Sequence, residues 1–597
     1  MKIIGYDTET YKGYVKLLAN SEGEYIESSN TVKLLDFLFK TGYKSDYNVF
    51  YNLEYDLGSI IKEYVVNEGE RLHKQFYEKL NAKKLIGAEE EDNGYSFNIE
   101  DYHVRYLSQK MFSLTKGKHT VYFWDTSNFY KSGFGYLSLD YVSQLYLNDS
   151  KNHEELLIDR ARIGYEEGYY EINREKIIKY CIKDCELTKR LFERTIESYQ
   201  NLGFTFPKKP YSEASIFKQY LNDRGWTKES DTAVLLQSLP DFSMFYNSYR
   251  GGIFRTFAIG HYENIYDIDI NSAYPSFLMS MPSVVNFSFK GKGEPSYSFY
   301  KVRGSLNKFR PIKSNKRLIY GKSKKKYTFF LTKPDLREGD EIVRQVHIYT
   351  QNKPLLPEIK DWYKKKFEMK QKYGKNSVEY LNIKIMINAG YGTFVQSVPN
   401  FTRFTNFIYG AYVTSLVRNK IEDLYNKITQ IGDKVISIST DGITVQNRTN
   451  DRGIEMLREY VGDDIGQLTM NTYDSITQFA NGIYILEKDD KYILKKRGFE
   501  QMKIEDLFKD EYELVYKSYK PMKIIQGIIQ KDYEHINDFV EQEKVFSPYN
   551  SWISINPELA EKIIDWKISD FHHRQLDVPE LDLDKYDFLI KEGDDNE

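Results

Sequence analysis

The amino-acid sequence predicts a multidomain protein that combines α/β and α+β parts. Its 597 residues suffice for about four domains with sizeable cores. Short apolar strands alternate with helical patterns before residue 200, and strands with tight turns recur in the later part of the chain. We expect a domain boundary near residue 200, because Pro207 and Pro210 interrupt the pattern there.

The composition of the sequence excludes several classes of protein. The sequence has no apolar run near the roughly 20 residues that span a bilayer, and Met1 to Gly5 leads directly into a strand rather than a signal peptide. Its two cysteines, Cys181 and Cys185, lie four apart on an expected helix, which fits neither a metal ribbon nor a disulfide framework. These features predict a cytoplasmic protein with no membrane partner.

The charges are segregated along the chain. The net charge of −3 argues against a uniformly basic nucleic-acid binder, yet residues 301–333 hold twelve Lys or Arg and no Asp or Glu. This basic stretch can be read as a solvated loop. Because it also contains Tyr320, Tyr327, Phe329 and Phe330, neutralisation of phosphates is the more economical interpretation.

Two strands of the first domain lead into acidic residues. Lys2 to Tyr6 is expected to be a buried strand that presents Asp7 and Glu9 on one face. Tyr47 to Tyr51 is expected to be a second strand, and it runs into the sequence Asn52-Leu53-Glu54-Tyr55-Asp56.

A helix near the end of this domain carries a third acidic motif. Apolar residues from Ile177 to Ile196 recur at helical spacing. Tyr180 and Asp184 are four residues apart and lie one above the other beside this apolar stripe. By themselves they fit an ordinary exposed helical pair, so the argument depends on the three motifs together.

The three motifs, in this order, resemble those of the proofreading 3′–5′ exonucleases with a ribonuclease-H-like fold. Four carboxylates that converge from two strands and a helix need cations to remain buried and ionised, as in a two-metal phosphodiesterase site. The resemblance implies that one metal ion activates the attacking water and the other stabilises the leaving 3′ oxygen. It implies the metal ligands Asp7, Glu9, Asp56 and Asp184, the water-orienting Tyr180, the strand-binding Asn52 and Tyr55, and Lys151 as a candidate further lysine.

A short strand in the second part of the chain delivers two more aspartates. Asn264 to Ile270 alternates so that Asp267 and Asp269 share one face, and from these residues alone a solvated strand end is the simpler interpretation. The sequence Asp269-x-x-Ser-x-Tyr274-Pro, however, resembles motif A of family B DNA polymerases. That motif implies that Asp269 and the Ile270 carbonyl bind metal and that Tyr274 fills the space of a ribose 2′-hydroxyl.

A glycine pair precedes motif A. Tyr249-Arg250-Gly251-Gly252 resembles the Tyr-x-Gly-Gly element of the same family, which lies between the two domains and contacts template DNA. Paired glycines let a backbone approach a phosphate closely, although a plain turn explains these four residues nearly as well.

Two helical segments follow motif A, over Trp362 to Ala389 with a joint near Gly374. The sequence Lys384-x-x-x-Asn388-Ala-Gly-Tyr391-Gly resembles motif B, the fingers helix of the family. The motif implies that Lys384 holds the triphosphate of a dNTP and that Tyr391 packs on the nascent base pair. Lys370 and Lys372 are additional candidate phosphate ligands.

Lys434 to Val445 predicts a hairpin with Asp441 at its tip, and from this pattern alone Asp441 is a turn residue. Family B polymerases carry Tyr-x-Asp-Thr-Asp here as motif C. This chain has Ser437-Ile438-Ser439-Thr440-Asp441, which keeps the second aspartate and replaces the first by Ser439. With Asp269, Asp441 would still bind both metal ions.

Two other positions depart from the family pattern. The helix before motif C has Ala411 where the family has an Arg. The Lys-x-Tyr element that grips the primer end is replaced by Gly482-Ile483-Tyr484, which leaves Lys495, Lys496 and Arg497 on the next strand as candidate substitutes.

The resemblance covers nearly the whole chain and implies its architecture. Residues 1–200 would form the exonuclease domain, and residues 201–597 a right-hand polymerase domain. In that domain we expect the palm at about 240–285 and 400–500, an insertion at about 286–360, the fingers at about 361–398 and a mixed helical thumb at about 500–597. The basic stretch has the position of the first insertion of the protein-primed subgroup, which holds template and terminal protein.

The implied function is DNA-templated DNA synthesis with proofreading, most like that of the protein-primed enzymes of small bacteriophages and linear plasmids. It implies two Mg²⁺ ions per active site, which Mn²⁺ can replace. The implied partners of the monomer are template and primer DNA, dNTPs, a terminal priming protein, and a single-stranded-DNA-binding protein or helicase. Two alternatives stay open: a family B enzyme that extends ordinary RNA or DNA primers, and, because of Ser439, a non-catalytic DNA-binding replication factor.

One feature of the protein-primed subgroup is missing. Its second insertion, between motifs B and C, helps to close a ring around DNA and to part the downstream duplex. Only 49 residues separate Gly392 from Asp441, and an expected helix over Tyr409 to Lys427 and the next strand use most of them. Val395 to Asn406 leaves room for a short turn, so we expect weak strand displacement and processivity unless another part of the system compensates.

Overall fold

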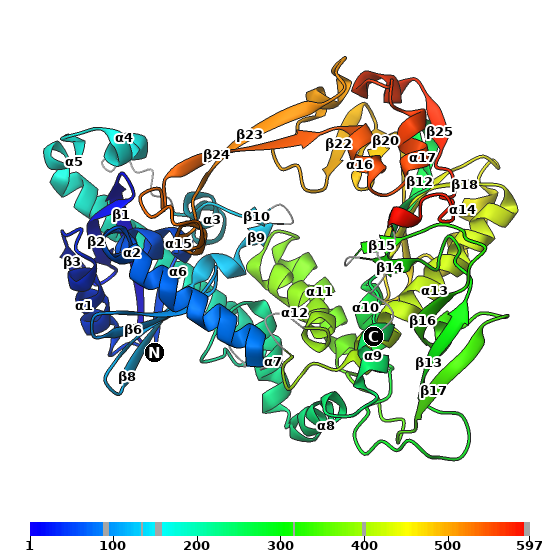
Figure 1. The fold of residues 1–597 in the computed structure, drawn as a ribbon, viewed down its shortest axis with the longest axis horizontal. Helices are drawn as coiled ribbons and strands as arrows, with labels where there is room; N and C mark the ends of the chain where they lie inside the picture. Colours follow the sequence, from blue (N-terminus) through cyan, green and yellow to red (C-terminus); the bar gives the residue numbers. More distant parts are fainter. Residues whose placement is uncertain (87–94, 133–134, 150–157, 315–316, 397–400, 590–597) are drawn as a thin grey trace.

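The computed structural model describes residues 1–86, 95–132, 135–149, 158–314, 317–396 and 401–589. Figure 1 shows two bodies, joined at the bottom of the view by helices and at the top by a long hairpin of β23 (Leu514–Pro521) and β24 (Phe539–Phe546). No helix among the described residues is both long and apolar enough to cross a membrane.

The N-terminal body is built on an eight-stranded sheet with the order β3-β2-β1-β4-β8-β7-β6-β5. β1 (Ile3–Tyr11) and β4 (Tyr47–Phe50) are parallel, and so are β4 and β8 (His119–Asp125). The carboxyl ends of these three strands therefore meet at one edge of the sheet. The antiparallel strands are β2 (Tyr14–Asn20), β3 (Tyr25–Ile26), β5 (Tyr95–Ile99), β6 (Tyr102–Leu107) and β7 (Met111–Lys116).

Long helices cover this sheet: α1 (Thr31–Gly42), α2 (Leu53–Ile86) and α6 (Arg174–Asn201). The expected stripe of α6 is confirmed, because its apolar residues from Ile177 to Ile196 are buried. α6 packs so closely on β1 that a Cβ on Gly5 would lie 2.1 Å from the Cys185 carbonyl oxygen. Only glycine permits this approach, which brings the acidic residues of β1 and α6 together. Shorter helices here are α3 (Leu139–Leu147), α4 (Arg160–Tyr165) and α5 (Tyr169–Ile172).

A second eight-stranded sheet forms the centre of the other body, in the order β11-β18-β19-β12-β20-β21-β22, with β25 also paired to β12. The hairpin expected around Asp441 is confirmed: β18 (Lys434–Thr440) and β19 (Gly442–Gln446) are joined through Thr440, which has a left-handed φ of 64°. The other strands are β11 (Ile253–Thr256), β12 (Ala258–Ile270), β20 (Leu468–Ala480), β21 (Ile483–Lys488), β22 (Lys491–Lys496) and β25 (Gln575–Asp577). Helices α10 (Ala273–Leu278), α13 (Phe407–Ile431) and α14 (Arg452–Leu457) accompany this sheet.

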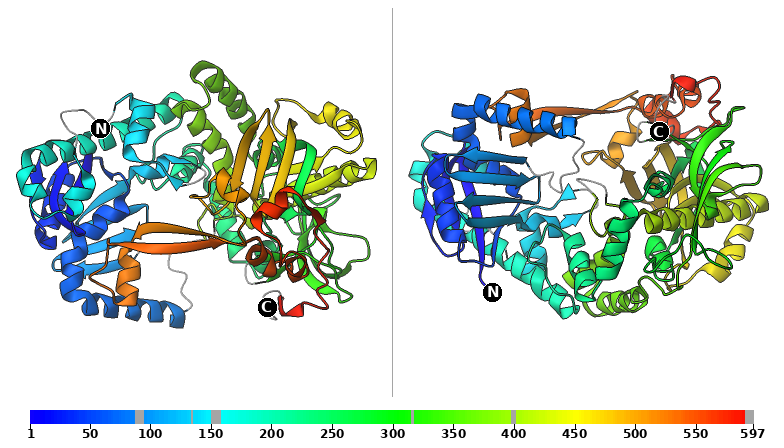
Figure 2. Two further views of the ribbon diagram at one scale, coloured as in Figure 1. Left: turned by 90° about the horizontal axis from the view of Figure 1, so that it is seen from above. Right: turned by 60° about the horizontal axis from the view of Figure 1, so that its bottom comes forward.

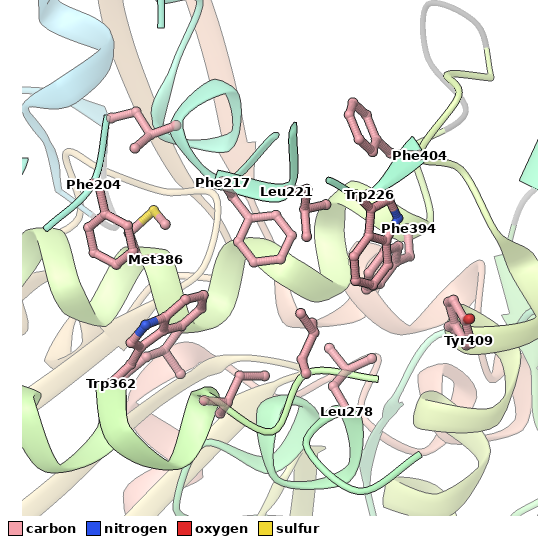
Figure 3. Packing of buried hydrophobic residues seen from close by; sticks show 14 of the residues in the cluster. Phe204, Phe217, Leu221, Trp226, Leu278, Trp362, Met386, Phe394, Phe404 and Tyr409 are labelled. Carbon is pink, nitrogen blue, oxygen red and sulfur yellow. The ribbon is translucent and has the colours of Figure 1, made fainter. Parts of the chain in front are cut away.

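An aromatic core joins the two bodies. The expected pair of helices is confirmed as α11 (Ile359–Tyr373) and α12 (Val378–Phe394), with Gly374 in the joint. Figure 3 shows the packing that holds α12, in which Trp226 stacks on Phe394 at 6.2 Å between ring centroids. The helices of the connecting segment are α7 (Glu213–Asp223), α8 (Thr227–Gln237) and α9 (Phe242–Ser248).

The basic stretch is largely folded, which corrects part of its sequence interpretation. β13 (Tyr297–Gly304) lies between β16 (Tyr327–Thr332) and β17 (Glu341–Ile348), and a hairpin of β14 (Ile312–Ser314) and β15 (Arg317–Ile319) precedes β16. Phe329 and Phe330 are buried in this unit, so they do not stack on bases. Arg310 forms a bidentate ion pair with Asp340. Lys322, Lys324 and Lys325 stay exposed.

The C-terminal region differs from the mixed helical region that we expected. Its main element is the β23–β24 hairpin, which carries α15 (Ile524–Gln530) at its tip. The helices α16 (Pro548–Ile553) and α17 (Pro557–Lys562) are short and pack at the base of the hairpin. Residues 514–521 show no clear alternation of apolar and polar residues, which would have predicted a strand. The middle of the hairpin is solvated on both sides, so both of its faces carry polar residues.

Candidate active sites

The acidic motifs of the N-terminal body converge on one cavity of about 790 Å³. β1 supplies Asp7 and Glu9, the first turn of α2 supplies Asp56, and α6 supplies Asp184. Asn52 and Tyr55 line the same cavity. Tyr180 lies one helical turn before Asp184 and is buried. Lys151 falls outside the described residues.

The electrostatics of this cavity fit a hard divalent cation. Asp56 is buried and accepts a 2.7 Å hydrogen bond from the Thr8 hydroxyl. Burial raises its pKa to about 7, and the charge of Asp125 adds to the effect. Asp7, Glu9 and Cys181 place ligand atoms within 4.8 Å of one another. Burial holds the pKa of the Cys181 thiol well above its usual range, so the carboxylate oxygens are the better ligands.

Asp125 is a residue of this site that the sequence analysis missed. Its buried carboxylate, at the end of β8, accepts hydrogen bonds from the backbone N–H groups of Asn52 at 3.0 Å and Leu53 at 3.2 Å. The same carboxylate accepts from the Ser127 hydroxyl at 2.6 Å. Asp125 thus fixes the start of α2, where Asn52 has a left-handed φ of 64°. An aspartate at a strand end followed by Thr-Ser was the available signal.

The C-terminal hairpin contributes to the same cavity. Pro521, Asn537 and Phe539 are among its lining residues, although they lie more than 300 residues from the acidic motifs in sequence. The Phe539 ring lies 6.4 Å from the Tyr55 ring, and the Asn537 side-chain amide donates a 2.6 Å hydrogen bond to the Tyr55 carbonyl oxygen. No sequence pattern links these segments.

In the second body, Asp269 and Asp441 lie on neighbouring strands. Asp269 pairs in register with Gly442, and the Ile270 N–H donates to the Asp441 carbonyl oxygen at 3.0 Å. The register places the two aspartates side by side at one end of the sheet. A Cβ on Gly442 would lie 3.3 Å from a carboxylate oxygen of Asp269, so glycine leaves this space open.

Burial and neighbouring charges raise the pKa values of the carboxylates at this end of the sheet. The surrounding protein displaces part of the hydration of Asp269, and the charges of Asp441 and Asp267 reinforce the effect, so that its pKa rises to about 7. The pKa of Asp441 is also raised, by burial. Two aspartates that repel each other at a solvent-accessible strand end are donors that suit a divalent cation. Ser439 is exposed on the strand before them, paired with Phe254 and Gly442.

Three tyrosines from separate motifs meet beside these aspartates. The Tyr274 and Tyr391 rings stack with centroids 4.4 Å apart, and the Tyr249 and Tyr391 hydroxyls are 2.7 Å apart. A Cβ on Gly252 would lie 3.0 Å from the Tyr274 hydroxyl and 2.7 Å from a methyl group of Thr440. Gly252 therefore lets the segment 249–252 pass close to motif A and to the tip of motif C.

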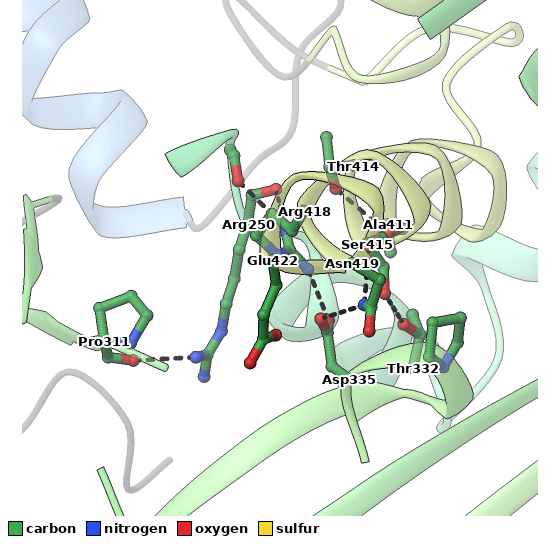
Figure 4. A network of polar contacts seen from close by, with 12 residues as sticks. Arg250, Pro311, Thr332, Asp335, Ala411, Thr414, Ser415, Arg418, Asn419 and Glu422 are labelled. Atoms are coloured by element: carbon green, nitrogen blue, oxygen red, sulfur yellow. Dashed lines mark hydrogen bonds and ion pairs between the residues drawn. The ribbon is translucent and has the colours of Figure 1, made fainter. Parts of the chain in front are cut away.

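The glycine segment is held from behind by a buried arginine (Figure 4). Arg418, on α13, donates hydrogen bonds to the carbonyl oxygens of Arg250 at 2.8 Å and Gly251 at 3.0 Å. Its other terminal nitrogen pairs with Asp335. Arg418 lies two helical turns after Ala411, so α13 carries a cation that the motif comparison did not identify.

Two of the three candidate phosphate-binding lysines lie together. Lys384 and Asn388 are exposed on one face of α12. Burial, together with the charges of Lys384 and Lys370, lowers the pKa of Lys366 to about 8, so these three lysines are close enough to interact electrostatically. The sequence analysis missed Lys366. Lys372 is separated from this group, because its ammonium lies over the Tyr373 ring at 4.8 Å on another face of α11.

The strand pair expected to grip the primer end also faces the aspartates. Tyr484 pairs in register with Lys495. Burial raises the pKa of Asp267 to about 6, whereas a hydrogen bond from Thr444 and the charge of Lys495 oppose this rise. Lys495, a candidate substitute from the sequence, therefore lies beside Tyr484 and near Asp267.

Comparisons with known proteins agree with this arrangement. The family described as DNA polymerase type B, organellar and viral, matches residues 35–310. A DNA polymerase of Acidianus bottle-shaped virus (isolate Italy/Pozzuoli) is 26% identical over 278 residues, which are 42% of this chain and 40% of the viral protein. The chain therefore covers less than half the length of this curated relative.

Solved structures share the fold over most of the chain. Phi29 DNA polymerase complexed with primer-template DNA, in a post-translocation binary complex, has a TM-score of 0.61 at 15% identity, covering 92% of this chain and 100% of that one. Its ternary complex with incoming nucleotide substrates has a TM-score of 0.60 at 16% identity, covering 92% and 99%. The family match and the viral relative each cover less than half of this chain, and the solved structures show that the chain shares their fold.

Proposed function

We propose that this chain is a family B DNA polymerase of the viral type, which copies a DNA template and removes mismatched 3′ ends at a separate exonuclease site. The observation that carries the proposal is the register of β12 and β19, which sets Asp269 beside Asp441. The stack of Tyr274 on Tyr391 brings α12 beside motif A, and Lys384 lies two turns before Tyr391 on the same helix.

For synthesis, Asp269, Asp441 and the Ile270 carbonyl would hold two divalent cations, taken to be Mg²⁺ with Mn²⁺ as a substitute. Bound there, the ions would activate a primer 3′-oxygen and neutralise the pyrophosphate that leaves. Lys384, Lys370 and Lys366 bind the triphosphate, because three ammonium groups close together suit a polyanion. Tyr274 and Tyr391 define the sugar and base side of the nucleotide pocket.

For proofreading, Asp7, Glu9, Asp56 and Asp184 would hold the cations of the cavity. Tyr180 orients the attacking water, and Asn52 and Tyr55 hold the frayed strand. The two sites draw their carboxylates from different sheets, so their activities are separable.

The experiment is a comparison of primer extension and primer degradation. Purified protein with a hydroxyl-terminated DNA primer, template, dNTPs and Mg²⁺ is expected to extend the primer. The double variant Asp7→Ala with Asp184→Ala is expected to lose degradation of single strands and to keep extension near wild type. Loss of both activities in a folded double variant would contradict the two-site proposal. No extension by wild type would favour a non-catalytic DNA-binding factor.

Priming by a terminal protein is a finer part of the proposal. It rests on the similarity to the protein-primed subgroup and on the exposed Lys322, Lys324 and Lys325 of the insertion, which suit template or a partner protein. The assay is attachment of a labelled nucleotide to a co-purified protein. Extension of ordinary primers without such labelling would favour the alternative enzyme. The free, buried Cys181 and Cys185 suit a reducing compartment such as the host cytoplasm.

A further inference from the structure

The strand β12 carries a second acidic residue behind the proposed cation ligand Asp269. It lies beside β20 in the central sheet of the second body, whose yellow-to-orange strands, residues 468–496, run side by side in Figure 2. Tyr266 and Ile268 are buried in the core between this sheet and α13, so Asp267 and Asp269 point to the opposite face. Asp269 is exposed and Asp267 is half-buried. Motif A begins at Asp269, so the family resemblance gives Asp267 no role.

The hydrogen-bond partner of Asp267 is a hydroxyl rather than a cation. The strand register sets Asp267 between Thr444 of β19 and Asn471 of β20, and its carboxylate accepts a 2.9 Å hydrogen bond from the Thr444 hydroxyl. No ion pair of Asp267 is found within the described part of the chain, and Lys495 acts on it only through its charge. A carboxylate that is partly removed from water is costly without a counterion. Its place on this face therefore favours a cation that binds from the open side.

The surroundings of Asp267 connect the proposed cation ligands to the strands of the primer end. Burial raises the pKa of Asp269, and the charges of Asp441 and Asp267 add to this effect, so the three carboxylates are close enough to interact. On the other side, burial and then the charge of Asp267 raise the pKa of Tyr484. Tyr484 packs against the cluster of Ile265, which precedes Asp267 by two residues on the same face. Asp267 thus lies between Asp269 and the tyrosine that the resemblance assigns to the primer end.

The same face lacks the carboxylate that the family carries on β18. Ser439 pairs with Gly442, and Gly442 pairs with Asp269, so position 439 lies two strands away from Asp269, or about 9.6 Å at roughly 4.8 Å per strand. Position 267 is two residues from Asp269 along its own strand, or about 6.7 Å. Both positions flank Asp269 on one face. From either, a carboxylate reaches a cation beside Asp269 through a bound water molecule.

We propose that Asp267 is a third carboxylate of the polymerase site, which β12 supplies toward the cations in place of the first aspartate of motif C. Asp267 is a positioning residue, because it acts through bound water on the cations that Asp269 and Asp441 would hold. The exchange keeps the number of carboxylates, and so the charge that draws divalent cations, unchanged. The inference rests on the proposed function, since it adds a residue to that same site.

The variant Asp267→Asn separates the charge from the hydrogen bond, because an amide oxygen still accepts from Thr444. The parent of all variants is Asp7→Ala with Asp184→Ala, which removes primer degradation and the cations of the other site. With saturating dNTP, Asp267→Asn is expected to slow primer extension about 10-fold or more and to raise the Mg²⁺ concentration that gives half the maximal rate. Thr444→Val, which removes the hydrogen bond and leaves the charge, is expected to have a far smaller effect. Glu263→Gln, at an exposed position of the same strand, is the matched control.

Ser439→Asp tests the exchange between the two strands. Added to Asp267→Asn, it returns a carboxylate to the position that the family uses, and it is expected to restore most of the extension rate and of the Mg²⁺ dependence. A local packing defect at position 267 would not be repaired by a change two strands away. Failure of Ser439→Asp to restore extension in a folded Asp267→Asn protein would overturn the proposal.

Binding of Mn²⁺ gives a readout without turnover. The protein is mixed with template, a dideoxy-terminated primer and the next dNTP, and free Mn²⁺ is followed by its electron paramagnetic resonance signal. The tightest Mn²⁺ binding is expected to weaken about 10-fold in Asp267→Asn and to be unchanged in Glu263→Gln.

The outcomes separate this inference from the proposed function. If the parent protein extends primers, and Asp267→Asn equals it in extension and in Mn²⁺ affinity, the role of Asp267 is refuted and the proposed function stands. A parent protein that does not extend a primer would contradict the proposed function. The Mn²⁺ affinities would then still decide the role of Asp267, because a weakened affinity in Asp267→Asn supports a cation site at this residue and an unchanged one refutes it.

Discussion

At the scale of single residues, the proposed chemistry of synthesis depends on which oxygen atoms lie beside Asp269. The strand register gives it Asp441 as a neighbour, and the replacement of the first aspartate of motif C leaves an exposed hydroxyl at Ser439. Burial and then the charge of Asp441 raise the pKa of Asp269, and burial raises that of Asp441; a bound cation would reverse both shifts. The Ser439 hydroxyl carries no charge, so it does not raise the pKa of Asp269 in this way.

Asp269→Ala and Asp441→Ala are each expected to abolish primer extension, because loss of a shared ligand disrupts both cation sites. Degradation of single strands, which uses other carboxylates, continues in both variants. Ser439→Ala is expected to reduce extension far less. The measurement is the extension rate with Mg²⁺, and an inactive Ser439→Ala protein would mean that motif C is misassigned.

Tyr274→Val is expected to raise incorporation of ribonucleotides relative to deoxyribonucleotides. The Tyr274 ring is held by its stack on Tyr391 and cannot swing away from a 2′-hydroxyl, so a smaller side chain relaxes a steric limit. Tyr249→Phe is the control, since it removes only the hydroxyl that meets Tyr391. Competition between the two nucleotide types measures the ratio, and an unchanged ratio in Tyr274→Val would remove the assignment.

At the scale of elements, α2 serves two functions at once. Its first turn presents Asp56 to the acidic cavity of the N-terminal body, the proposed exonuclease site, and residues farther along the helix pack against the hairpin tip. Both depend on how the helix begins. Asp125 sets that start through two backbone hydrogen bonds from a strand that the acidic motifs do not include.

Asp125→Ala is expected to lower the free energy of unfolding by about 1–3 kcal/mol, because it leaves the buried N–H group of Leu53 and the N–H group of Asn52 without their acceptor. Exonuclease activity should fall more than extension, since Asn52 and Asp56 lose their fixed position. Denaturant unfolding and the two activity assays measure this. Asn67→Ala, at an exposed position of α2, serves as the control, and equal losses in both variants would refute the role of Asp125.

At the scale of the whole molecule, the short connection between motifs B and C bears on strand displacement. Parting a downstream duplex needs an element ahead of the polymerase site, and the connection from Val395 to Asn406, of which 397–400 lie outside the described residues, offers only a short segment.

On a primed single-stranded circle, with a trap for dissociated protein, we therefore expect products no longer than about the length of the circle, which end at the latest where the enzyme meets the primer end. Gel analysis of product length gives the answer. Products many times the circle length, made by this protein alone, would show that the missing insertion does not limit strand displacement.

The sequence by itself determined the local parts: the buried strand before Asp7, the apolar stripe of α6, the two fingers helices and the hairpin around Asp441. Each depends on periodicity or turn chemistry within a few residues, and motif order added the family resemblance. The sequence also located Asp269 and Asp441, because each family motif is a short contiguous pattern of residues.

Only the tertiary structure decided which distant segments meet. Asp125, Lys366, Arg418 and the hairpin tip join the sites through contacts between residues far apart in the chain, and a single sequence carries no pattern for such pairs. The same reason explains the two corrections to the sequence predictions. Phe329 and Phe330 are buried, and a hairpin over 514–546 stands where a helical region was expected. In both places the packing partners of a strand, rather than the local composition, determine which of its residues are buried.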